Sequence, residues 1–409
     1  MTERHILLAN VFFAPFSYGG ATIVAEQVAH ALIKQGGFRV TAVSMCTRHD
    51  LAPYSVVKSQ KDGITNYLIN VPQGRSYGQI YDNPEVTARL AELVATLTPD
   101  LVHVHCIQDM GAGIFDVAQA ADIPVILSVH DFWWICERQF MIRVDQKYCG
   151  QYPVQIENCK GCVENFYAAK VRETRLKKTG ALAACVTYPS KFALDLSEKS
   201  DFAAGKGVVW ENGVHLPKPD FFERQAQRRS KDGKLTFGFV GGPSQIKGWP
   251  HIRKAFSELE NEDFRVLVVD GSLDGSWWTG HDLSKLPGDW EVISRFTQDR
   301  MDDFYSEIDV LLFMSQWKET FGLAIREALA RGIKIIQTDS GGTVEHGAVP
   351  AEKLIPIGAP ATVLREHLKS ALDAKSQEQN PYPVASFEEQ AAAFGKLAEQ
   401  VLKRYKAST

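Results

Sequence analysis

The chain has 409 residues, of which 45% are hydrophobic and 23% charged, and its formal net charge is −4. This length is too great for one ordinary hydrophobic core and suits two domains of about 150–200 residues each. The negative balance argues against nucleic acid as a partner, and no apolar run reaches the roughly 18 residues of a membrane-spanning helix.

The start of the chain and its cysteines favour a cytoplasmic protein. Residues 5–13 are apolar, but they lack a basic flank and a small-residue cleavage site, so a first strand is expected rather than a secretory signal. The seven cysteines are an odd number in a long chain without a signal, which suits a reducing compartment.

Strand-like and helix-like patterns alternate along the first half of the chain. This alternation predicts a parallel sheet wrapped by helices. The expected strands are 5–13, 38–45, 101–106, 124–130 and 182–187. The expected helices are 21–34, 86–96, 111–120, 166–178 and one that starts at Ser190.

The alternation restarts in the second half. Residues 205–233 are mixed in character and rich in proline and charge, which is typical of a linker. The final helix is expected to open with a capping box formed by Ser386 and Glu389. The expected strands are 234–240, 266–269, 290–294, 310–313 and 333–338.

Two acidic residues follow one of these strands. Residues 308–313 are apolar enough for a strand buried on both faces, Glu319 lies in the loop after it, and Glu327 lies on the next helix. Ligands of open α/β sheets bind at this edge, and free N–H groups at a helix start suit anionic ones. Carboxylates beside an anion site fit a ligand that also offers hydroxyl groups, as a nucleotide-sugar does.

The arrangement of Glu319 and Glu327, with Phe321-Gly322 between them and Gly341-Gly342 after the next strand, resembles the donor site of retaining glycosyltransferases of family 4. The resemblance implies an α/β protein of the GT-B fold, with two Rossmann-like domains facing a central cleft. It implies no cofactor for the chemistry. The expected parts are an acceptor-side domain (1–205), a donor domain (206–385) and a helix that crosses back to the first domain (386–409).

The resemblance assigns a role to each acidic residue. Glu327 would accept both hydroxyls of the nucleotide ribose. Glu319 would hold hydroxyls of the transferred sugar, with the N–H groups of Phe321, Gly322 and Leu323 nearby. Taken alone, Glu327 would be an exposed helix glutamate and Glu319 a charge that stabilises a helix start.

The stretch 237–248 matches the family's phosphate-binding strand and loop, with one departure. That pattern usually has an arginine and, five residues later, a lysine. Lys247 is present, but Gly242 stands in the arginine's place. Two phosphate charges need about two cationic or dipolar partners. The missing one would come from backbone N–H groups at 241–244 or from another arginine, for which Arg295 is the candidate.

The first domain offers a glycine pair and a histidine. Gly19-Gly20 would face the donor phosphates in the resembling family, whereas alone the pair would be a tight turn. His130 ends a parallel strand, and the equivalent histidine contacts the donor sugar near the bond that breaks. No G-x-G-x-x-G and no Walker lysine motif occurs, which weakens a nicotinamide or ATP interpretation.

Two further polar residues are candidates for the acceptor side. His105 ends the neighbouring strand and could line the acceptor pocket, with His103 packed beneath it on the same strand face. Asp131 follows His130 directly and is expected on the same side.

Four cysteines form an independent signal in the insertion 131–165. Their spacing, C-x12-C-x9-C-x2-C, in a segment of little regular periodicity suits a structural zinc ion that would staple a loop lacking its own core. Disulfides or an iron–sulfur cluster are the alternatives. The four residues are Cys136, Cys149, Cys159 and Cys162.

The helix 166–178 carries five cations. A charge run of this kind is usually a solvated face, but transferases that act on lipid-linked acceptors often carry a basic helix that contacts anionic head groups. This predicts peripheral contact with the inner face of the membrane. The cations are Lys170, Arg172, Arg175, Lys177 and Lys178.

The expected protein is a cytoplasmic retaining glycosyltransferase that moves a hexosyl unit from a UDP- or GDP-linked sugar to a hydroxyl of a glycan or lipid-linked acceptor. Surface polysaccharide or glycolipid biosynthesis is the expected setting. An epimerase or hydrolase of the same fold remains open, as does a non-catalytic nucleotide-sugar-binding protein, which the missing arginine favours.

Overall fold

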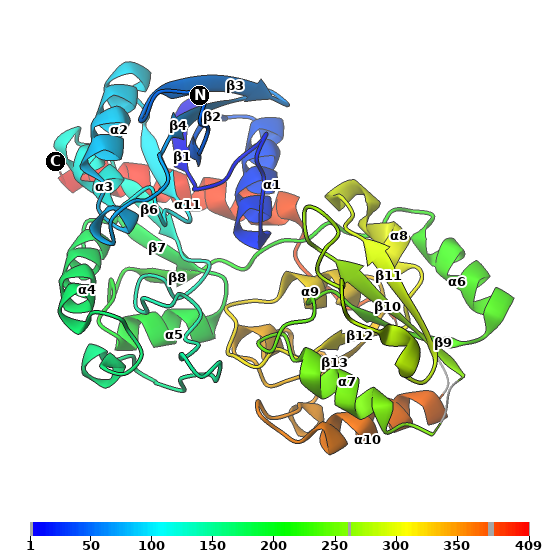
Figure 1. The fold of residues 1–409 in the computed structure, drawn as a ribbon. Helices are drawn as coiled ribbons and strands as arrows, with labels where there is room; N and C mark the ends of the chain where they lie inside the picture. Colours follow the sequence, from blue (N-terminus) through cyan, green and yellow to red (C-terminus); the bar gives the residue numbers. More distant parts are fainter. Residues whose placement is uncertain (1–2, 261–262, 375–379, 409) are drawn as a thin grey trace. The chain divides into compact units, whose positions relative to one another are not determined.

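The computed structural model describes residues 3–260, 263–374 and 380–408 and divides into two compact units (Figure 1). The first unit comprises Met1–Met141, Gly150–Gly213 and Ala385–Thr409, and the second comprises Ile142–Cys149 and Val214–Val384. The first unit therefore extends to Gly213 rather than to residue 205.

The first unit is built on an eight-stranded sheet in the order β3-β4-β2-β1-β5-β6-β7-β8. Neighbouring strands are parallel except β3 and β4. Strands β5, β6 and β7 consist of buried residues throughout, as expected for parallel strands covered by helices on both faces. The strands are β1 (Arg4–Ala9), β2 (Phe38–Cys46), β3 (Val56–Lys61), β4 (Ile64–Asn70), β5 (Leu101–Val104), β6 (Val125–Ser128), β7 (Cys185–Tyr188) and β8 (Gly207–Val209). The helices are α1 (Gly20–Gln35), η1 (Gly78–Ile80), α2 (Pro84–Leu97), α3 (Gly113–Ala120), η2 (Ile156–Cys159), α4 (Phe166–Gly180), α5 (Lys191–Lys199) and α11 (Phe387–Ser408).

The antiparallel hairpin β3–β4 is absent from the sequence prediction. Its strands are joined by Asp62 and Gly63, both with positive φ, which is the turn chemistry of a two-residue hairpin. The alternating burial of β4 is the matching period-two signal.

Helix α11 packs within the first unit although it comes last in the chain (Figure 1). Gln35 at the end of α1 donates to the carbonyl of Glu388 (2.7 Å), and Phe394 stacks on His103 at 4.1 Å. The capping box is present, because the N–H of Glu389 bonds the hydroxyl of Ser386 (3.1 Å) and the Glu389 carboxylate bonds the Ser386 N–H (2.8 Å).

The second unit is built on a five-stranded parallel sheet in the order β11-β10-β9-β12-β13. Its strands are β9 (Leu235–Phe239), β10 (Phe264–Asp270), β11 (Asp289–Ser294), β12 (Val310–Phe313) and β13 (Lys334–Gln337). Its helices are α6 (Phe221–Asp232), α7 (Trp249–Ser257), η3 (Leu283–Lys285), η4 (Gln298–Arg300), α8 (Met301–Tyr305), α9 (Leu323–Leu329), η5 (Gly342–His346), η6 (Ala351–Lys353) and α10 (Ala361–Asp373).

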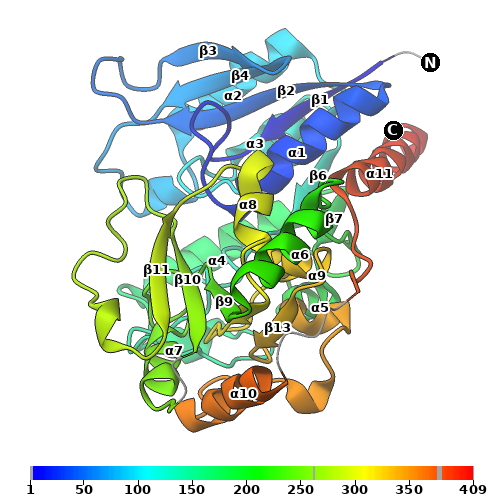
Figure 2. The same cartoon turned by 90° about the vertical axis from the view of Figure 1, so that its right-hand side faces the viewer.

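Each face of this sheet has its own apolar core. Helices α7 and α10 cover one face, and α6, α8 and α9 cover the other (Figure 2). The expected linker at 205–233 is therefore partly wrong, because it contains β8 and the helix α6, whose Phe221 is fully buried.

A buried ion pair fixes the start of β12. Asp309 is 4% exposed and receives two bonds from Arg228 (2.8 Å each), one from Arg229 (2.8 Å) and one from the N–H of Thr236 (2.9 Å). Burial alone would raise the pKa of Asp309. The hydrogen bonds and charge of Arg228, together with the hydrogen bonds from the Thr236 N–H and from Arg229, outweigh burial and lower the pKa. The ion pair thus ties α6 to the strand that leads into Glu319.

Asp309→Ala is expected to destabilise the protein by roughly 3–5 kcal/mol, because it leaves buried guanidinium charge without its partner. Urea unfolding of the full chain measures the loss. Because the folded pKa is depressed, the stabilisation is present above the unfolded value of about 4 and disappears as pH falls through the folded value. Asp289→Ala, which removes an exposed partner of Lys234, is the control and should cost under about 1 kcal/mol. Equal losses in the two variants would contradict the assignment.

Candidate functional site

Lys247 and Glu319 form an ion pair at the carboxyl edge of the five-stranded sheet. Lys247 lies between β9 and α7, Glu319 lies between β12 and α9, and Nζ is 2.7 Å from Oε1. The Lys247 ammonium also lies 5.7 Å from the ring centre of Trp317. The structure thus brings together the predicted phosphate-binding lysine and the predicted sugar-binding carboxylate.

The loop that carries Glu319 is held by the loop after β13. The N–H of Glu319 donates to the carbonyl of Ser340, and the N–H of Gly342 donates to the carbonyl of Glu319, both at 2.9 Å. Gly322, directly before α9, has a φ of 84°, and a Cβ there would lie 3.1 Å from Thr343. Glycine is therefore needed where the chain turns into the helix.

The buried side chain of Arg326 connects the loop before α9 to the loop after β13. Sequence analysis did not identify this residue. Its side chain is 1% exposed and donates to the carbonyls of Phe321 (2.8 Å), Thr343 (2.5 Å) and Gly342 (3.1 Å). Its guanidinium also lies 4.2 Å from the ring centre of Phe321. One buried cation thereby satisfies three loop carbonyls and fixes the path of the backbone around Gly322.

Glu327 is oriented by a tyrosine that sequence analysis also missed. The hydroxyl of Tyr305, on α8, donates to Oε2 of Glu327 (2.7 Å) and lies 3.3 Å from the carbonyl of Ala324. Burial raises the pKa of Glu327, and the Tyr305 bond and the charge of Arg331 oppose that rise. Burial, followed by the nearby Glu327, raises the pKa of Tyr305 well above its usual value, so the hydroxyl stays a donor.

Gly242 and Arg295 lie at the same edge of the sheet. Gly242 follows β9 with a φ of 66°, and the ring of Trp277 covers it. Arg295 directly follows β11, two strands away from β9, and is exposed. The role of Arg295 in binding phosphate therefore stays a prediction.

In the first unit, Gly19 and Gly20 begin α1. Gly19 has a φ of 82° and stands directly before the helix, of which Gly20 is the first residue. The preceding loop is fixed by the buried side chain of Asn10, which donates to Thr22 (3.1 Å) and accepts the N–H of Cys106 (3.0 Å). The glycine pair therefore sits at the carboxyl edge of β1, where it was expected.

Three histidines form a row at the ends of β5 and β6. Nδ1 of His105 is 2.8 Å from Nε2 of His130, with the rings stacked at 5.1 Å, and His103 lies 4.1 Å from His105. Burial lowers the pKa of His130 to about 4 and those of His103 and His105 well below their usual value, so all three are neutral at pH 7. His105 is only 1% exposed and lies behind His130 rather than on the surface of a pocket.

The carboxylate of Asp131 orders the segment that follows His130. It accepts the N–H of Trp133 (2.8 Å) and the amides of Gln139 (2.6 Å) and Gln108 (3.1 Å). Burial raises the pKa of Asp131, with these bonds opposing the rise. The role that the geometry gives Asp131 is to hold this loop, and its predicted acceptor-side role stays a prediction.

The predicted zinc site receives no support. Within the residues that the structure describes, no group of three or more His, Cys, Asp or Glu side chains is placed to hold a metal ion. Cys136, Cys159 and Cys162 fall in the first unit and Cys149 in the second. The segment is also anchored by packing, because four of its large apolar side chains are 5% exposed or less. These are Phe132, Trp133, Trp134 and Met141.

Four of the five cations of the basic helix α4 have a carboxylate or carbonyl partner in the first unit, whereas Lys178 is exposed, and membrane contact stays a prediction. Arg172 is 4% exposed, donates to the carbonyl of Trp133 and lies over its ring. Arg175 pairs with Asp82 (3.1 Å) and with Asp116. The remaining pairs are Lys170–Glu157 (2.9 Å) and Lys177–Glu173 (3.1 Å). Across the described part of the chain, no helix combines the length and apolarity needed to cross a bilayer.

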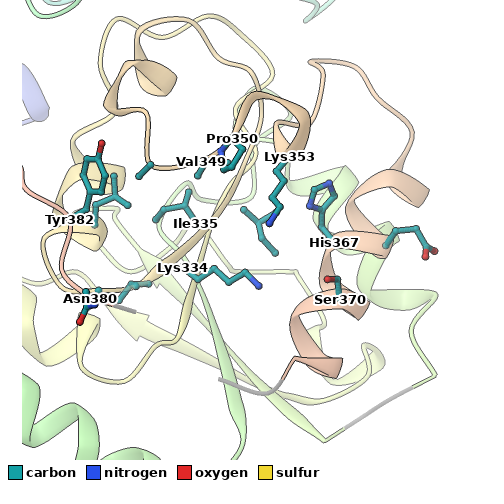
Figure 3. A pocket seen from close by; sticks show the side chains of 15 residues that line it. Lys334, Ile335, Val349, Pro350, Lys353, His367, Ser370, Asn380 and Tyr382 are labelled. Carbon is teal, nitrogen blue, oxygen red and sulfur yellow. The ribbon is translucent and has the colours of Figure 1, made fainter. Parts of the chain in front are cut away.

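A cavity of about 430 Å³ lies along β13 and α10, apart from these groups (Figure 3). Lys334, Lys353 and His367 line it, and neither Glu319 nor Glu327 does. Burial, then the charge of Lys353, lowers the pKa of Lys334. The cavity is therefore separate from the candidate site.

Comparison with known proteins identifies the class. Residues 18–218 match the model of Glycosyltransferase Family 4, and residues 220–380 match that of Glycosyl transferases group 1. The chain is thus a glycosyltransferase of the GT-B fold. It belongs to glycosyltransferase family 4, as the acidic pair and its glycines predicted.

Two curated proteins are similar to this chain. Spore coat protein SA of Bacillus subtilis (strain 168) is 31% identical over 126 residues, which are 28% of this chain and 32% of that protein. A protein of Klebsiella pneumoniae described as an uncharacterized 42.6 kDa protein in cps region is 20% identical over 98% of this chain and 100% of its own length.

Solved structures share the fold over nearly the whole chain. The sucrose-phosphate synthase of Thermosynechococcus elongatus has a TM-score of 0.66 at 16% identity, with 99% of each chain covered. The Anabaena HepE structure in complex with UDP-glucose has a TM-score of 0.57 at 13% identity, with 99% of this chain and 98% of that chain covered. At such identities the likeness shows the fold alone.

Arg326→Leu is expected to lower the free energy of unfolding by roughly 3 kcal/mol, because three buried carbonyls lose their donor. Urea unfolding of the full chain provides the measurement. Arg300→Leu is the matched control, since its side chain is 70% exposed and bonds only an exposed carboxylate; it should cost no more than about 0.5 kcal/mol. A loss at Arg326 as small as that of the control would show that the loops do not depend on it.

Proposed function

We propose that this protein is a retaining glycosyltransferase that moves a hexosyl unit from a UDP- or GDP-linked sugar to a hydroxyl acceptor. The observation that carries the proposal is the arrangement of two pairs in the second unit: Lys247–Glu319 at the carboxyl edge of the sheet, and Tyr305–Glu327 on the helices α8 and α9 that cover one of its faces. One cation and two separately oriented carboxylates match the three parts of a nucleotide-sugar: diphosphate, transferred sugar and ribose.

In this proposal each group binds the part of the donor that its chemistry suits. Lys247 and the backbone N–H groups of Gly241 and Gly242 offset the diphosphate charge, since Pro243 has no N–H and that of Ser244 donates to the carbonyl of Gly242. Glu319 accepts hydroxyls of the transferred sugar beside the N–H groups of Phe321, Gly322 and Leu323. The ribose hydroxyls would bind Glu327, whose carboxylate Tyr305 holds in place.

The Lys247–Glu319 pair would also prepare the site for the donor. The two charged groups hold each other at 2.7 Å. A bound diphosphate would then share the ammonium with Glu319 rather than draw a mobile side chain from solvent. Little side-chain entropy would be lost on binding, and the ammonium would stand ready for charge that develops on the leaving group.

The acceptor reaction would use the first unit. His130 is neutral, so it would hydrogen-bond the donor sugar and not act as a cation. We propose retention of configuration by analogy with the family, with front-face attack and the departing phosphate oxygen taking the acceptor's proton. The similarity to a protein of the Klebsiella pneumoniae cps region supports surface polysaccharide or glycolipid biosynthesis as the setting. The cytoplasm is the proposed location, and peripheral membrane contact through helix 166–178 would rest on its exposed lysines, Lys170 and Lys178.

A thermal-shift panel of UDP-, GDP-, ADP- and dTDP-sugars tests donor binding, because a ligand raises the melting temperature in proportion to its affinity. Transfer to glycan acceptors is then assayed with the best donor. Turnover of the donor without any acceptor would indicate a hydrolase or epimerase. Tight donor binding without transfer to any acceptor would indicate the binding protein that the missing arginine favours.

Glu319→Gln and Glu327→Gln are each expected to lower kcat/KM by about 10- to 100-fold, because each removes a charged hydrogen bond to donor hydroxyls. Steady-state kinetics on variants with unchanged circular dichroism give the measurement. Glu366→Gln on α10, a residue whose side chain is 63% exposed, is the control and should leave kcat/KM unchanged. If the folded Glu319 and Glu327 variants transfer sugar at the parental rate, the proposed function is wrong.

A further inference from the structure

The indole of Trp277 occupies the space where the family's arginine side chain would begin. A Cβ on Gly242 would lie 2.6 Å from Cε3 of Trp277, and a Cβ on Gly271 would lie 2.7 Å from its Cη2. Both glycines are therefore required for the ring to lie where it does. An arginine at position 242 and the indole of Trp277 could not both occupy this space, so the glycine and the tryptophan depend on each other.

The loop that carries Trp277 is held firmly in place. The carboxylate of Asp270 accepts the N–H of Ser272 (2.9 Å), and Trp278 is 5% exposed and donates to the carbonyl of Val269 (3.1 Å). Burial would raise the pKa of Asp270, but bonds from Ser272 and from the N–H groups of Trp278 and Trp277 lower it. Trp278 thus anchors the loop while Trp277 keeps 38% of its surface exposed.

Trp277 lies against Gly242, in the loop that leads from β9 to Lys247. Its anchor Trp278 packs on Trp249 of α7 at 4.8 Å, in the core on the α7 face of the sheet. Tyr305, which holds Glu327, belongs to the core on the opposite face. Gly241, beside Gly242, is in turn packed on Lys247, since a Cβ there would lie 2.9 Å from the lysine's Cβ.

We propose that Trp277 stacks against a pyranosyl ring next to the diphosphate, which deepens and rests on the proposed function. A pyranose offers an apolar face of C–H groups, and a preorganised, half-exposed indole is a surface that such a face covers at little entropic cost. The ring belongs either to the transferred sugar or to the acceptor. The ring thus stands where the family's second cation would lie and recognises the sugar, while the diphosphate charge is left to Lys247 and to backbone N–H groups.

The test compares Trp277→Ala, Trp277→Phe and the control Leu273→Ala, which removes a 77% exposed side chain from the same loop. Isothermal titration gives the Kd of UDP-glucose, GDP-glucose, UDP and GDP, and kinetics give the KM of the acceptor.

If the stacked ring is that of the transferred sugar, Trp277→Ala raises the Kd of the nucleotide-sugar about tenfold and leaves the Kd of the free nucleotide unchanged. If the stacked ring belongs to the acceptor, the Kd of the donor is unchanged and the KM of the acceptor rises about tenfold. Trp277→Phe should retain most of the effect, and Leu273→Ala should show none.

Two results would overturn the stacking role while sparing the proposed function. The first is an equal loss for free nucleotide and nucleotide-sugar, which would place a nucleobase on the ring. The second is parental binding and parental KM in Trp277→Ala. Failure of the parent protein to bind any nucleotide or nucleotide-sugar would instead refute the proposed function, and the stacking role with it.

A ligand-free check addresses the packing itself. Gly242→Ala should lower the melting temperature, because the new methyl group meets the indole and the residue has a positive φ. In the Trp277→Ala background only the cost of the positive φ remains, so the loss should be smaller. Equal losses in both backgrounds would show that Gly242 and Trp277 are not coupled.

A separate observation in the first unit concerns His105. Within the described part of the chain no hydrogen-bond partner is found for its buried Nε2. A buried acceptor without a partner costs less than a buried N–H without one. The proton of His105 therefore belongs on Nδ1, which donates to Nε2 of His130 at 2.8 Å.

We infer that His105 is a positioning residue that keeps His130 in the tautomer with its proton on Nδ1. The stacked rings, 13° from parallel, also fix the plane in which that N–H points. His130 would then meet the donor sugar as a hydrogen-bond donor of fixed direction, a step that rests on the proposed function. The tautomer itself does not rest on it.

Nitrogen-15 NMR of the imidazole rings reads the tautomer directly. The parent should show His130 protonated on Nδ1; His105→Phe should change that pattern, and His105→Asn, whose amide can still donate, should retain it. His103→Phe is the matched control, because this buried histidine on the same strand bonds Ser128 and not His130.

In kinetics His105→Phe should lower kcat/KM about tenfold. A His130 signal protonated on Nε2 in the parent, or unchanged in His105→Phe, would refute the inference whether or not the protein transfers sugar.

Discussion

The buried guanidinium of Arg326 holds together the two loops on which the proposed donor site depends. The loop before α9 has no helix or strand, and the loop after β13 runs into the short helix η5. Some of their carbonyls therefore need donors from elsewhere, and one side chain supplies three of these bonds. With those bonds in place, Glu319 is fixed by backbone pairing to Ser340 and Gly342. The geometry of the proposed donor site is thus set below the surface, by a residue that need not touch the donor.

Local patterns made part of this site predictable from the sequence. Glu319 and Glu327 lie where a strand turns into a helix, and Gly322 occupies a position with positive φ that favours glycine. Arg326 and Tyr305 escaped notice because their roles depend on which carbonyls and carboxylates the fold brings near them. An arginine in a helix and a tyrosine at a helix end have no spacing that distinguishes them from surface residues.

The cysteine segment shows the opposite failure, in which a strong local pattern misled. The C-x-x-C spacing suggested a metal, and the irregular periodicity suggested a segment with no core. In the structure, Phe132, Trp133 and Trp134 are buried, and Asp131 orders the backbone. Buried aromatic residues in a loop follow neither helical nor strand periodicity, so the sequence pattern does not show that they are buried. The same limit hid the charge pairing of α4, because the partners of Arg175 lie 93 and 59 residues away.

The placement of α11 has a consequence for synthesis on the ribosome. The indole of Trp210 bonds the carbonyl of Gln390 (3.0 Å), and Phe394 stacks on His103, so the first unit shares its core with residues made after the second unit. Domains usually fold in the order in which they emerge. Here the second unit can complete its own core first, while the nascent first unit keeps an apolar face that stays open until residue 394 leaves the exit tunnel. A chaperone would find its binding surface there.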